Sequence, residues 1–287
     1  MSRDRPRRSA LYLPASNARA IEKARTLPCD VVILDLEDSV APEAKAGARA
    51  LACEAVRQGG FGTREVVIRV NGLDTHWAGD DLREAAAAGP DAILLPKLAS
   101  TDDIESCAEQ VDGRAALWGM IETCQAIFHL DALGAASRGC GFEAWVLGTN
   151  DLVKEMRCVP GEDRAPLAPA LSLAVMAARA HGLSILDGVY NDIPNLDGLV
   201  RECAQGARLG FDGKSLIHPT HLEAANRAFS PLPEDVAWAR TVVAAYEQPE
   251  NAAKGVIKVE GRMVERLHLA QAKRLIAVAD AISAHEA

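Results

Sequence analysis

Several features are scarce in this sequence, and each scarcity excludes a class of protein. No apolar run approaches the roughly 18 residues that a membrane-spanning helix needs. No apolar signal-peptide core follows the Arg-rich start at residues 1–8. No G-x-G-x-x-G fingerprint follows the first expected strand, so a dinucleotide site is not expected. These absences predict a cytoplasmic protein that has no membrane partner.

Cationic charge and paired cysteines are scarce as well. The formal net charge is −9, which argues against nucleic acid as a partner because nonspecific binding needs a positive surface. The seven cysteines are odd in number, scattered, and include no C-x-x-C pair. They are expected to be reduced, mostly buried thiols, neither zinc ligands nor disulfides.

Short apolar runs alternate with amphipathic stretches along most of the chain. The expected strands cover residues 10–14, 30–36, 65–70, 92–95, 116–121, 144–147, 183–187 and 210–215. The expected helices cover residues 18–26, 42–58, 80–88, 101–110, 126–136, 167–181, 196–209 and 219–228. Strands separated by helices indicate parallel βαβ units. Eight such units predict an α/β fold, a (β/α)8 TIM barrel, with an open doubly wound sheet as the alternative.

The pattern changes after Phe229. A Pro-containing break at residues 230–233 precedes two expected helices, 233–247 and 267–285, with a short hairpin at 255–261 between them. We expect residues 1–229 to form the TIM-barrel catalytic domain and residues 230–287 a short C-terminal helical extension. The extension is expected to be too short for a core of its own, and to pack on its barrel or on a neighbouring subunit.

Charged side chains gather where the expected strands end, which in a barrel is where the loops build the active site. They are Asp35, Glu37, Asp38, Arg69, Lys97, Glu122, Asp151, Asp187 and Lys214. Ion pairs that close the barrel mouth would explain any single one of these residues as well as catalysis does. They explain the whole set less well, because clustering charges in a desolvated site is costly.

Glu122 and Asp151 follow adjacent expected strands at matching positions, so their oxygens can converge on one cation. Two carboxylates, completed by water and substrate oxygens, suit Mg²⁺. No His or Cys accompanies them, which disfavours zinc. Arg69, two strands away, can fork onto a substrate carboxylate or carbonyl oxygen. We interpret His218 and His221 as the start of a helix rather than as catalysts.

The strand-end motifs, taken in order, closely resemble those of the citrate lyase β-subunit family within the HpcH/HpaI aldolase superfamily. The matching segments are RSALYLPASN (8–17), DVVILDLEDSV (30–40), IRVNGLDT (68–75), LLPK (94–97), GMIET (119–123), LGTNDL (147–152), LDGVYND (186–192) and GFDGKSLIHP (210–219). They span nearly the whole expected barrel, so the resemblance does not depend on a single motif.

This resemblance implies a Mg²⁺-dependent lyase that acts on 3-hydroxyacyl thioesters such as malyl-CoA or citramalyl-CoA. By likeness, Glu122 and Asp151 correspond to the metal ligands and Arg69 to a substrate-contacting arginine. Glu37 and Asp38 correspond to carboxylates around the metal-bound waters. Relatives commonly bind coenzyme A near the turn after the first strand, where the candidates here are Asn17, Arg19 and Lys23.

Two departures from the family pattern stand out. The glycine common in the first turn of relatives is Ala15 here. Malyl-CoA and citramalyl-CoA lyases place an Asp in the tail after a Gly-x-Met segment, whereas this chain has Glu265 after Gly261 and Met263. The additional methylene moves the carboxyl by about 1.5 Å, and a displacement of that size can cost about 100-fold in rate.

The expected reaction breaks a carbon–carbon bond to give acetyl-CoA and a 2-oxo acid, or forms that bond in reverse. Arg69 would steady the departing enolate, and Glu265, from the same or a neighbouring subunit, would protonate it. A homo-oligomer, trimeric or hexameric, is expected. Three alternatives remain: the citryl-ACP lyase subunit of a citrate lyase, an acyl-CoA thioesterase, and a non-catalytic barrel that binds acyl-CoA.

Overall fold

The computed structural model describes residues 5–251 and 253–286. The chain forms two compact units, one of residues Arg7–Phe229 and the other mainly of residues 230–287. In the described part of the chain, no helix combines the length and apolar character needed to cross a membrane.

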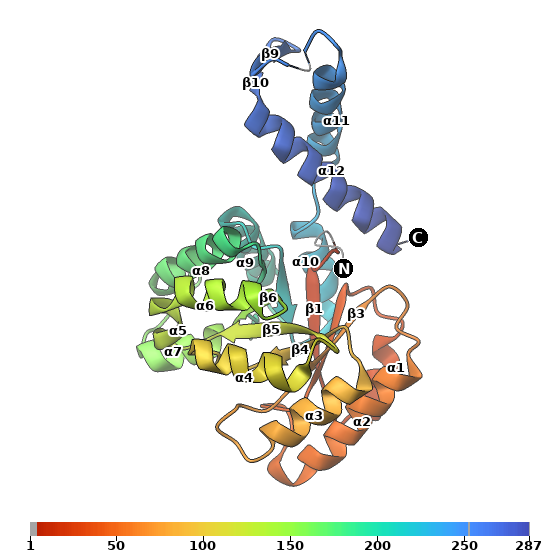
Figure 1. Ribbon diagram of the computed structural model, residues 1–287, viewed down its shortest axis with the longest axis vertical. Helices are drawn as coiled ribbons and strands as arrows, with labels where there is room; N and C mark the ends of the chain where they lie inside the picture. The colour runs from red at the N-terminus through yellow and green to blue at the C-terminus, as the bar shows by residue number, and fades with distance from the viewer. Residues whose placement is uncertain (1–4, 252, 287) are drawn as a thin grey trace. The chain divides into compact units, whose positions relative to one another are not determined.

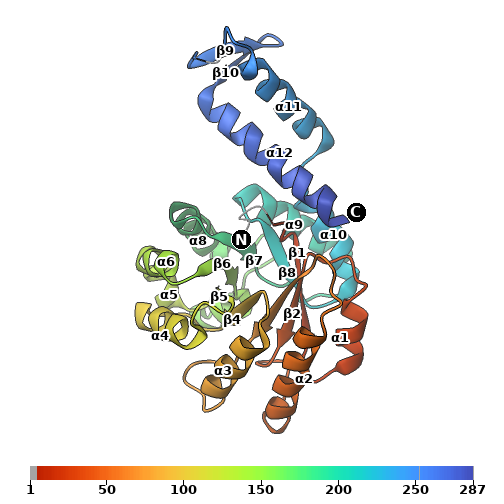
Figure 2. The same cartoon turned by 45° about the vertical axis from the view of Figure 1, so that its right-hand side comes forward.

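The larger unit is a closed barrel of parallel strands, which confirms the predicted (β/α)8 TIM barrel. The strands are β1 (Ser9–Pro14), β2 (Val31–Asp35), β3 (Glu65–Arg69), β4 (Ala92–Leu95), β5 (Ala116–Ile121), β6 (Phe142–Leu147), β7 (Ser184–Asp187) and β8 (Gly213–Leu216). Each strand pairs with the next, and β8 returns to β1 by pairing Ser215 with Ala10. The helices lie around the outside of the strands (Figure 1, Figure 2).

Ten α-helices are described in the barrel unit between residues 7 and 229. They are α1 (Ala18–Ala24), α2 (Lys45–Gln58), α3 (Ala78–Ala88), α4 (Thr101–Val111), α5 (Cys124–Phe128), α6 (Leu130–Gly139), α7 (Thr149–Met156), α8 (Ala168–His181), α9 (Leu196–Leu209) and α10 (Leu222–Ala228). Short 3₁₀ helices, η1 (Pro42–Ala44), η2 (Ala165–Leu167) and η3 (Pro219–His221), precede α2, α8 and α10.

Three local expectations differ from the structure. The helix expected at 126–136 is two helices that meet at His129, and the first begins earlier because the Thr123 hydroxyl caps it by accepting from Ala126 N at 3.0 Å. Helix α7 was not expected. Strand β8 starts three residues late, because Gly210 ends α9 in the left-handed conformation, with φ of 98°.

Alternation along the strands decides which side chains face the barrel interior. Val31 and Ile33 of β2 pack inside the barrel, while Val32 and Leu34 belong to the layer between the strands and the helices. The next inward position on β2 is Asp35. By the same alternation, Val67 of β3 is followed inward by Arg69, and Met120 of β5 by Glu122. On β2, β3 and β5, the inward-facing side chains are therefore apolar inside the barrel and charged at its mouth, where the strands end.

Ion pairs close the opposite end of the barrel. The Arg7 guanidinium donates two hydrogen bonds of 2.7 Å to Glu65 and one of 2.8 Å to Glu143, and Arg8 pairs with Asp30 at 2.8 Å. The amino-terminal face of a TIM barrel serves stability, so these charges need no catalytic explanation.

The smaller unit contains α11 (Pro233–Glu247), a hairpin of β9 (Val256–Val259) and β10 (Arg262–Glu265), and α12 (Arg266–Glu286). Helices α11 and α12 pack side by side (Figure 1, Figure 2). The expectation that this segment has no core of its own is wrong. Val242, Tyr246, Ile257 and Val264 form a buried cluster, and the Tyr246 hydroxyl donates to Val264 O at 2.8 Å. The hairpin extends to Glu265, beyond the expected range, and so it contributes Val264 as well as Ile257 to this cluster.

Candidate active site

The arginine expected to contact substrate is held firmly in the barrel mouth. Asp35 and Arg69 are register partners at the ends of β2 and β3. The Arg69 guanidinium donates to the two Asp35 oxygens at 2.6 and 2.8 Å and lies 2.8 Å from Glu37. It also stacks on the Tyr12 ring, 4.8 Å from the centroid. Arg69 is buried, and its orientation is fixed before any ligand arrives.

Asp35 is the anchor of this arrangement. Its carboxylate is fully buried and accepts five hydrogen bonds, two from Arg69, two from Ser39 and one from Glu37 N. Burial alone would raise the pKa of Asp35, but the hydrogen bonds and charge of Arg69 outweigh it and hold the pKa below its ordinary value. Asp35 therefore remains ionised and serves to position Arg69.

Glu122 directly follows β5 and is 2% exposed. Its Oε1 accepts a 2.6 Å hydrogen bond from the backbone N–H of Lys97. Its Oε2 lies against Gly148, where a Cβ would overlap it, so the absence of a side chain there makes room for the carboxylate. Burial, together with the charges of Glu37 and Asp151, raises the pKa of Glu122 to about 7.

Asp151 lies in the first turn of α7, directly after β6. Its charge contributes to the raised pKa of Glu122, so the two carboxylates are close enough to repel each other. Within residues 5–251 and 253–286, neither the Asp151 carboxylate nor Oε2 of Glu122 forms a hydrogen bond or ion pair. The site thus offers two carboxylates without an ion-pair partner, on neighbouring β/α units, and one oxygen of Glu122 is already hydrogen-bonded to the Lys97 N–H.

Glu37, Asp38 and Lys97 complete the mouth. Glu37 bridges two cations, since it lies 2.8 Å from Arg69 and accepts from Lys97 Nζ at 3.0 Å. Burial raises the pKa of Glu37, and the charge of Arg69 offsets part of that increase. Asp38 is exposed and lies 3.6 Å from Arg69.

These side chains suit a divalent cation with oxygen ligands. Among the residues the structure describes, the ion pairs of the five carboxylates Asp35, Glu37, Asp38, Glu122 and Asp151 are made with Arg69 and Lys97, so negative charge is in excess. The described residues contain no preformed group of three or more His, Cys, Asp or Glu ligands. Two protein carboxylates with the remaining positions left to water and substrate match the preference of Mg²⁺.

Other residues with predicted site roles lie elsewhere in the chain. Asn17 caps α1 by accepting from Ala20 N at 3.1 Å, and Arg19 and Lys23 are exposed on that helix. Glu265 ends β10 in the smaller unit, where it is exposed. The roles of these four residues in binding or catalysis stay predictions.

The two histidines near the end of the barrel do begin a helix, as expected. His218 caps η3 by accepting from Thr220 N at 3.3 Å. His221 is fully buried, and its Nε2 lies 3.2 Å from Ile193 O.

Three residues that shape the mouth were given no role from the sequence. They are Tyr12, which stacks on Arg69, Lys97, which binds Glu122 and Glu37, and Gly148, which makes room for Glu122. The position of Lys97 at the end of a strand was a visible signal. The backbone conformation of Lys97 and the close approach of Glu122 to Gly148 could not be seen in the sequence.

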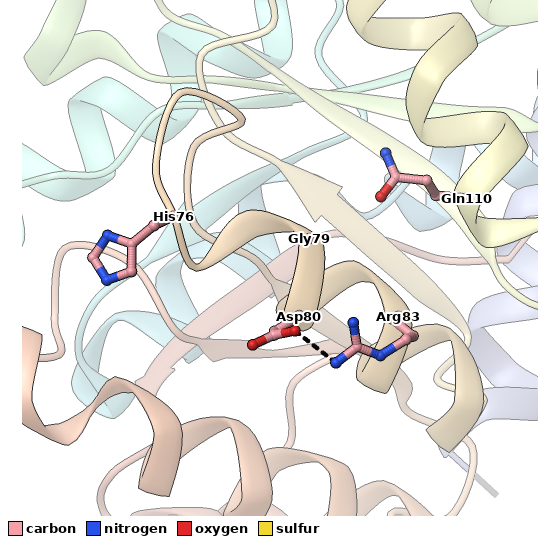
Figure 3. Close-up of a pocket in the computed structure, with 5 residues that line it drawn as sticks. All are labelled: His76, Gly79, Asp80, Arg83 and Gln110. Atoms are coloured by element: carbon pink, nitrogen blue, oxygen red, sulfur yellow. Dashed lines mark hydrogen bonds and ion pairs between the residues drawn. The ribbon is translucent and has the colours of Figure 1, made fainter.

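A surface hollow of about 420 Å³ lies outside this group of residues. Its lining is His76, Gly79, Asp80, Arg83 and Gln110. Figure 3 shows Asp80 joined to Arg83, a 2.6 Å hydrogen bond between exposed side chains. The charges of this hollow neutralise each other, and no carboxylate of the barrel mouth lines it.

Comparisons with known proteins agree with the fold. A family model described as HpcH/HpaI aldolase/citrate lyase matches residues 8–219. A (3S)-malyl-CoA thioesterase of Cereibacter sphaeroides (strain KD131 / KCTC 12085) is 45% identical over 98% of both chains. The citrate lyase subunit beta of Leuconostoc mesenteroides subsp. cremoris is 32% identical over 98% of this chain and 96% of the relative. A crystal structure of CitE from Mycobacterium tuberculosis with magnesium, acetoacetate and coenzyme A is 29% identical, with a TM-score of 0.76, and the match covers 97% of this chain and all of that one.

Proposed function

The chain belongs to the HpcH/HpaI aldolase/citrate lyase family, and from this we propose that it is a Mg²⁺-dependent enzyme acting on malyl-CoA or a closely related 3-hydroxyacyl-CoA. The proposed reaction breaks the carbon–carbon bond beside the hydroxyl-bearing carbon. Its products are acetyl-CoA and a 2-oxo acid, which is glyoxylate when the substrate is malyl-CoA.

The observation that carries this proposal is the unpaired carboxylate pair at the barrel mouth. Glu122 and Asp151 would hold the metal ion, since their free oxygens lie in an excess of negative charge. The magnesium in the related CitE structure supports this choice of ion. When bound, Mg²⁺ supplies Lewis-acid polarisation of a substrate oxygen and a fixed point for chelation.

The protein's own groups would handle the charge and the protons. Arg69, held in place by Asp35, would face the enolate that develops as the bond breaks, without reorganising at that moment. Glu37 and Asp38, which lie 2.8 and 3.6 Å from Arg69, are the carboxylates proposed to receive the hydroxyl proton. Glu265 is the residue proposed to return a proton to the acetyl carbon.

Hydrolysis of the thioester is a second candidate, and a specific observation favours it. The relative that shares 45% identity over 98% of both chains is named a (3S)-malyl-CoA thioesterase. The tail residue is also Glu265 here, not the Asp expected of lyases. The same substrate would then yield malate and free CoA, with the malyl carbon skeleton intact.

Product analysis distinguishes these reactions. The purified protein would be incubated with (3S)-malyl-CoA, once with Mg²⁺ and once with EDTA. Glyoxylate and acetyl-CoA identify the lyase, and malate with free CoA identifies the thioesterase. Binding without either product set would indicate the non-catalytic barrel, and activity that requires other subunits would indicate the citrate lyase component. Gel filtration would show whether the protein is the expected homo-oligomer.

The Glu122→Ala variant tests the metal assignment. We expect it to lose Mg²⁺ binding by calorimetry as well as turnover, because it removes one of the two barrel-mouth carboxylates that have no ion-pair partner among the described residues. Glu162→Ala is the matched control, since Glu162 is an exposed glutamate paired at 3.3 Å with Arg201. Unchanged turnover of Glu122→Ala would rule out the metal assignment.

A further inference from the structure

Lys97 has an unusual backbone conformation for a residue with a side chain. It follows β4 and Pro96, and its φ is 53°, in the left-handed region that favours glycine. Strained conformations of this kind persist only where their surroundings enforce them, and they cluster at functional sites.

The backbone of Lys97 has an evident task. Its N–H donates the 2.6 Å hydrogen bond to Oε1 of Glu122, which leaves Oε2 of Glu122 free. A glycine would present the same N–H in the same conformation without strain. The backbone contact therefore does not explain why a lysine side chain occupies this position.

The ammonium group of Lys97 is only partly used within the protein. It donates to Glu37 Oε1 at 3.0 Å, and the side chain is 48% exposed. A lysine ammonium has three hydrogens, and the other two have no partner among the residues the structure describes. A lysine side chain is ordinarily protonated at neutral pH, and the 3.0 Å contact with the Glu37 carboxylate favours the charged form.

The charges nearest to the ammonium group belong to the proposed metal site. Glu37 accepts from it at 3.0 Å and also pairs with Arg69 at 2.8 Å, and the backbone of Lys97 binds Glu122. A free cationic donor at this position can receive an anionic oxygen that reaches the mouth together with the metal.

We propose that Lys97 is a substrate-binding residue whose ammonium group pairs with the carboxylate of the substrate's acid half, while its backbone N–H orients Glu122. The inference rests on the proposed function for the identity of the substrate. Lys97 would thus have two roles, since its backbone N–H donates to the metal ligand Glu122 and its ammonium group binds the substrate.

Two substitutions separate the two tasks. Lys97→Gly retains the N–H and relieves the conformation but removes the ammonium group, whereas Lys97→Arg retains a cation. Asp112→Gly is the matched control, because Asp112 has a φ of 52° at the end of α4 and its carboxylate lies 3.6 Å from the exposed Arg114. Calorimetry would measure binding of Mg²⁺ to the metal-free protein, and then of malate and of CoA, separately, to the Mg²⁺-loaded protein.

We expect Lys97→Gly to bind Mg²⁺ as the wild type does. Its affinity for malate should fall by about 10- to 100-fold, the loss expected for a hydrogen bond between charged groups. Lys97→Arg should recover most of that loss, Asp112→Gly should lose none, and the two glycine variants should show similar changes in melting temperature.

Other results would overturn the inference in identifiable ways. Unchanged malate affinity in Lys97→Gly refutes the role of the ammonium group, and a loss confined to CoA assigns that group to phosphate instead. A parallel loss of Mg²⁺ affinity refutes the division between backbone and side chain. If the wild type binds no malate with Mg²⁺, the inference fails directly. If malate binding behaves as expected but malyl-CoA is not turned over, only the proposed function fails.

Discussion

Replacing Asp35 with Asn should destabilise the barrel far more than its small change in volume suggests. The substitution removes the charge that holds Arg69 at 2.6 and 2.8 Å, in a site where Asp35 is fully buried. An amide also places a donor where the carboxylate accepts from Arg69, Ser39 and Glu37 N. Breaking a buried ion pair from one side costs about 3–5 kcal/mol. For a barrel of this size, that corresponds to a fall of about 10 °C in melting temperature.

The pH dependence of this loss has a definite sign. The folded-state pKa of Asp35 lies below its ordinary value, so the carboxylate stabilises the protein above the unfolded pKa of about 3.9. This contribution is lost as the pH falls through the folded-state value. Urea unfolding at a series of pH values should therefore show a constant difference between wild type and variant near neutrality, which narrows below about pH 4.

An exposed pair of the same length provides the control. Arg83 donates to Asp80 at 2.6 Å, but both side chains are exposed. Asp80→Asn should leave the unfolding midpoint unchanged, since solvent screens such pairs. A loss of no more than about 1 kcal/mol in Asp35→Asn, the range of surface pairs, would refute the argument that burial makes the Asp35–Arg69 pair important.

Two further predictions concern the neighbouring strands. In Gly188→Ala the added Cβ would overlap Thr149, the first residue of α7. Because α7 carries Asp151, we expect this variant to bind Mg²⁺ more weakly by calorimetry. Gly79→Ala is the control and should bind Mg²⁺ normally, because its added Cβ meets open space. Lys214→Met removes a fully buried ammonium group that contacts Glu202 at 2.6 Å and Asp187 at 3.2 Å, while Asp187 keeps Arg164 at 2.8 Å. Unfolding should show a loss of about 3 kcal/mol, the lower end of the range for a broken buried pair; a stability equal to that of the wild type would contradict the pairing.

Most of the barrel could be predicted from local pattern. Runs such as Val31–Leu34, bounded by polar residues, indicate strands buried on both faces. Their alternation with amphipathic helices indicates a parallel, closed topology. What pattern could not show was helix α7, because its start, Gly148-Thr149-Asn150, has the composition of a turn. Missing α7 matters for function, because this helix carries Asp151.

The core of the smaller unit was missed for a different reason. Its apolar residues are few in each segment, and none of the segments is amphipathic enough to suggest a core alone. Val242 of α11, Ile257 of β9 and Val264 of β10 become a core only when the hairpin brings them together. Such nonlocal contacts are not visible in a short window of sequence.

In the site, residue types were predictable but pairings were not. Acidic residues at the ends of neighbouring strands indicated a metal site, since parallel strands end at the same edge of a barrel. The left-handed conformation of Lys97 depends on how the loop closes after Pro96. The hydrogen bond from its backbone to Glu122 therefore could not be derived from the order of residues.

The ambiguity between ion pairing and catalysis at the strand ends is resolved residue by residue. The Asp35 carboxylate is paired with Arg69, and the Asp187 carboxylate is paired with Arg164 and Lys214, so the charges of these two carboxylates are accounted for by structure. Glu122 and Asp151 differ, because Oε2 of the one and the whole carboxylate of the other have no partner in the described chain. The Lys97 N–H and the charge of Arg69 offset only part of the repulsion and burial that raise the pKa of Glu122. A bound cation would relieve that repulsion, and the paired residues around the mouth hold the unpaired ones in place.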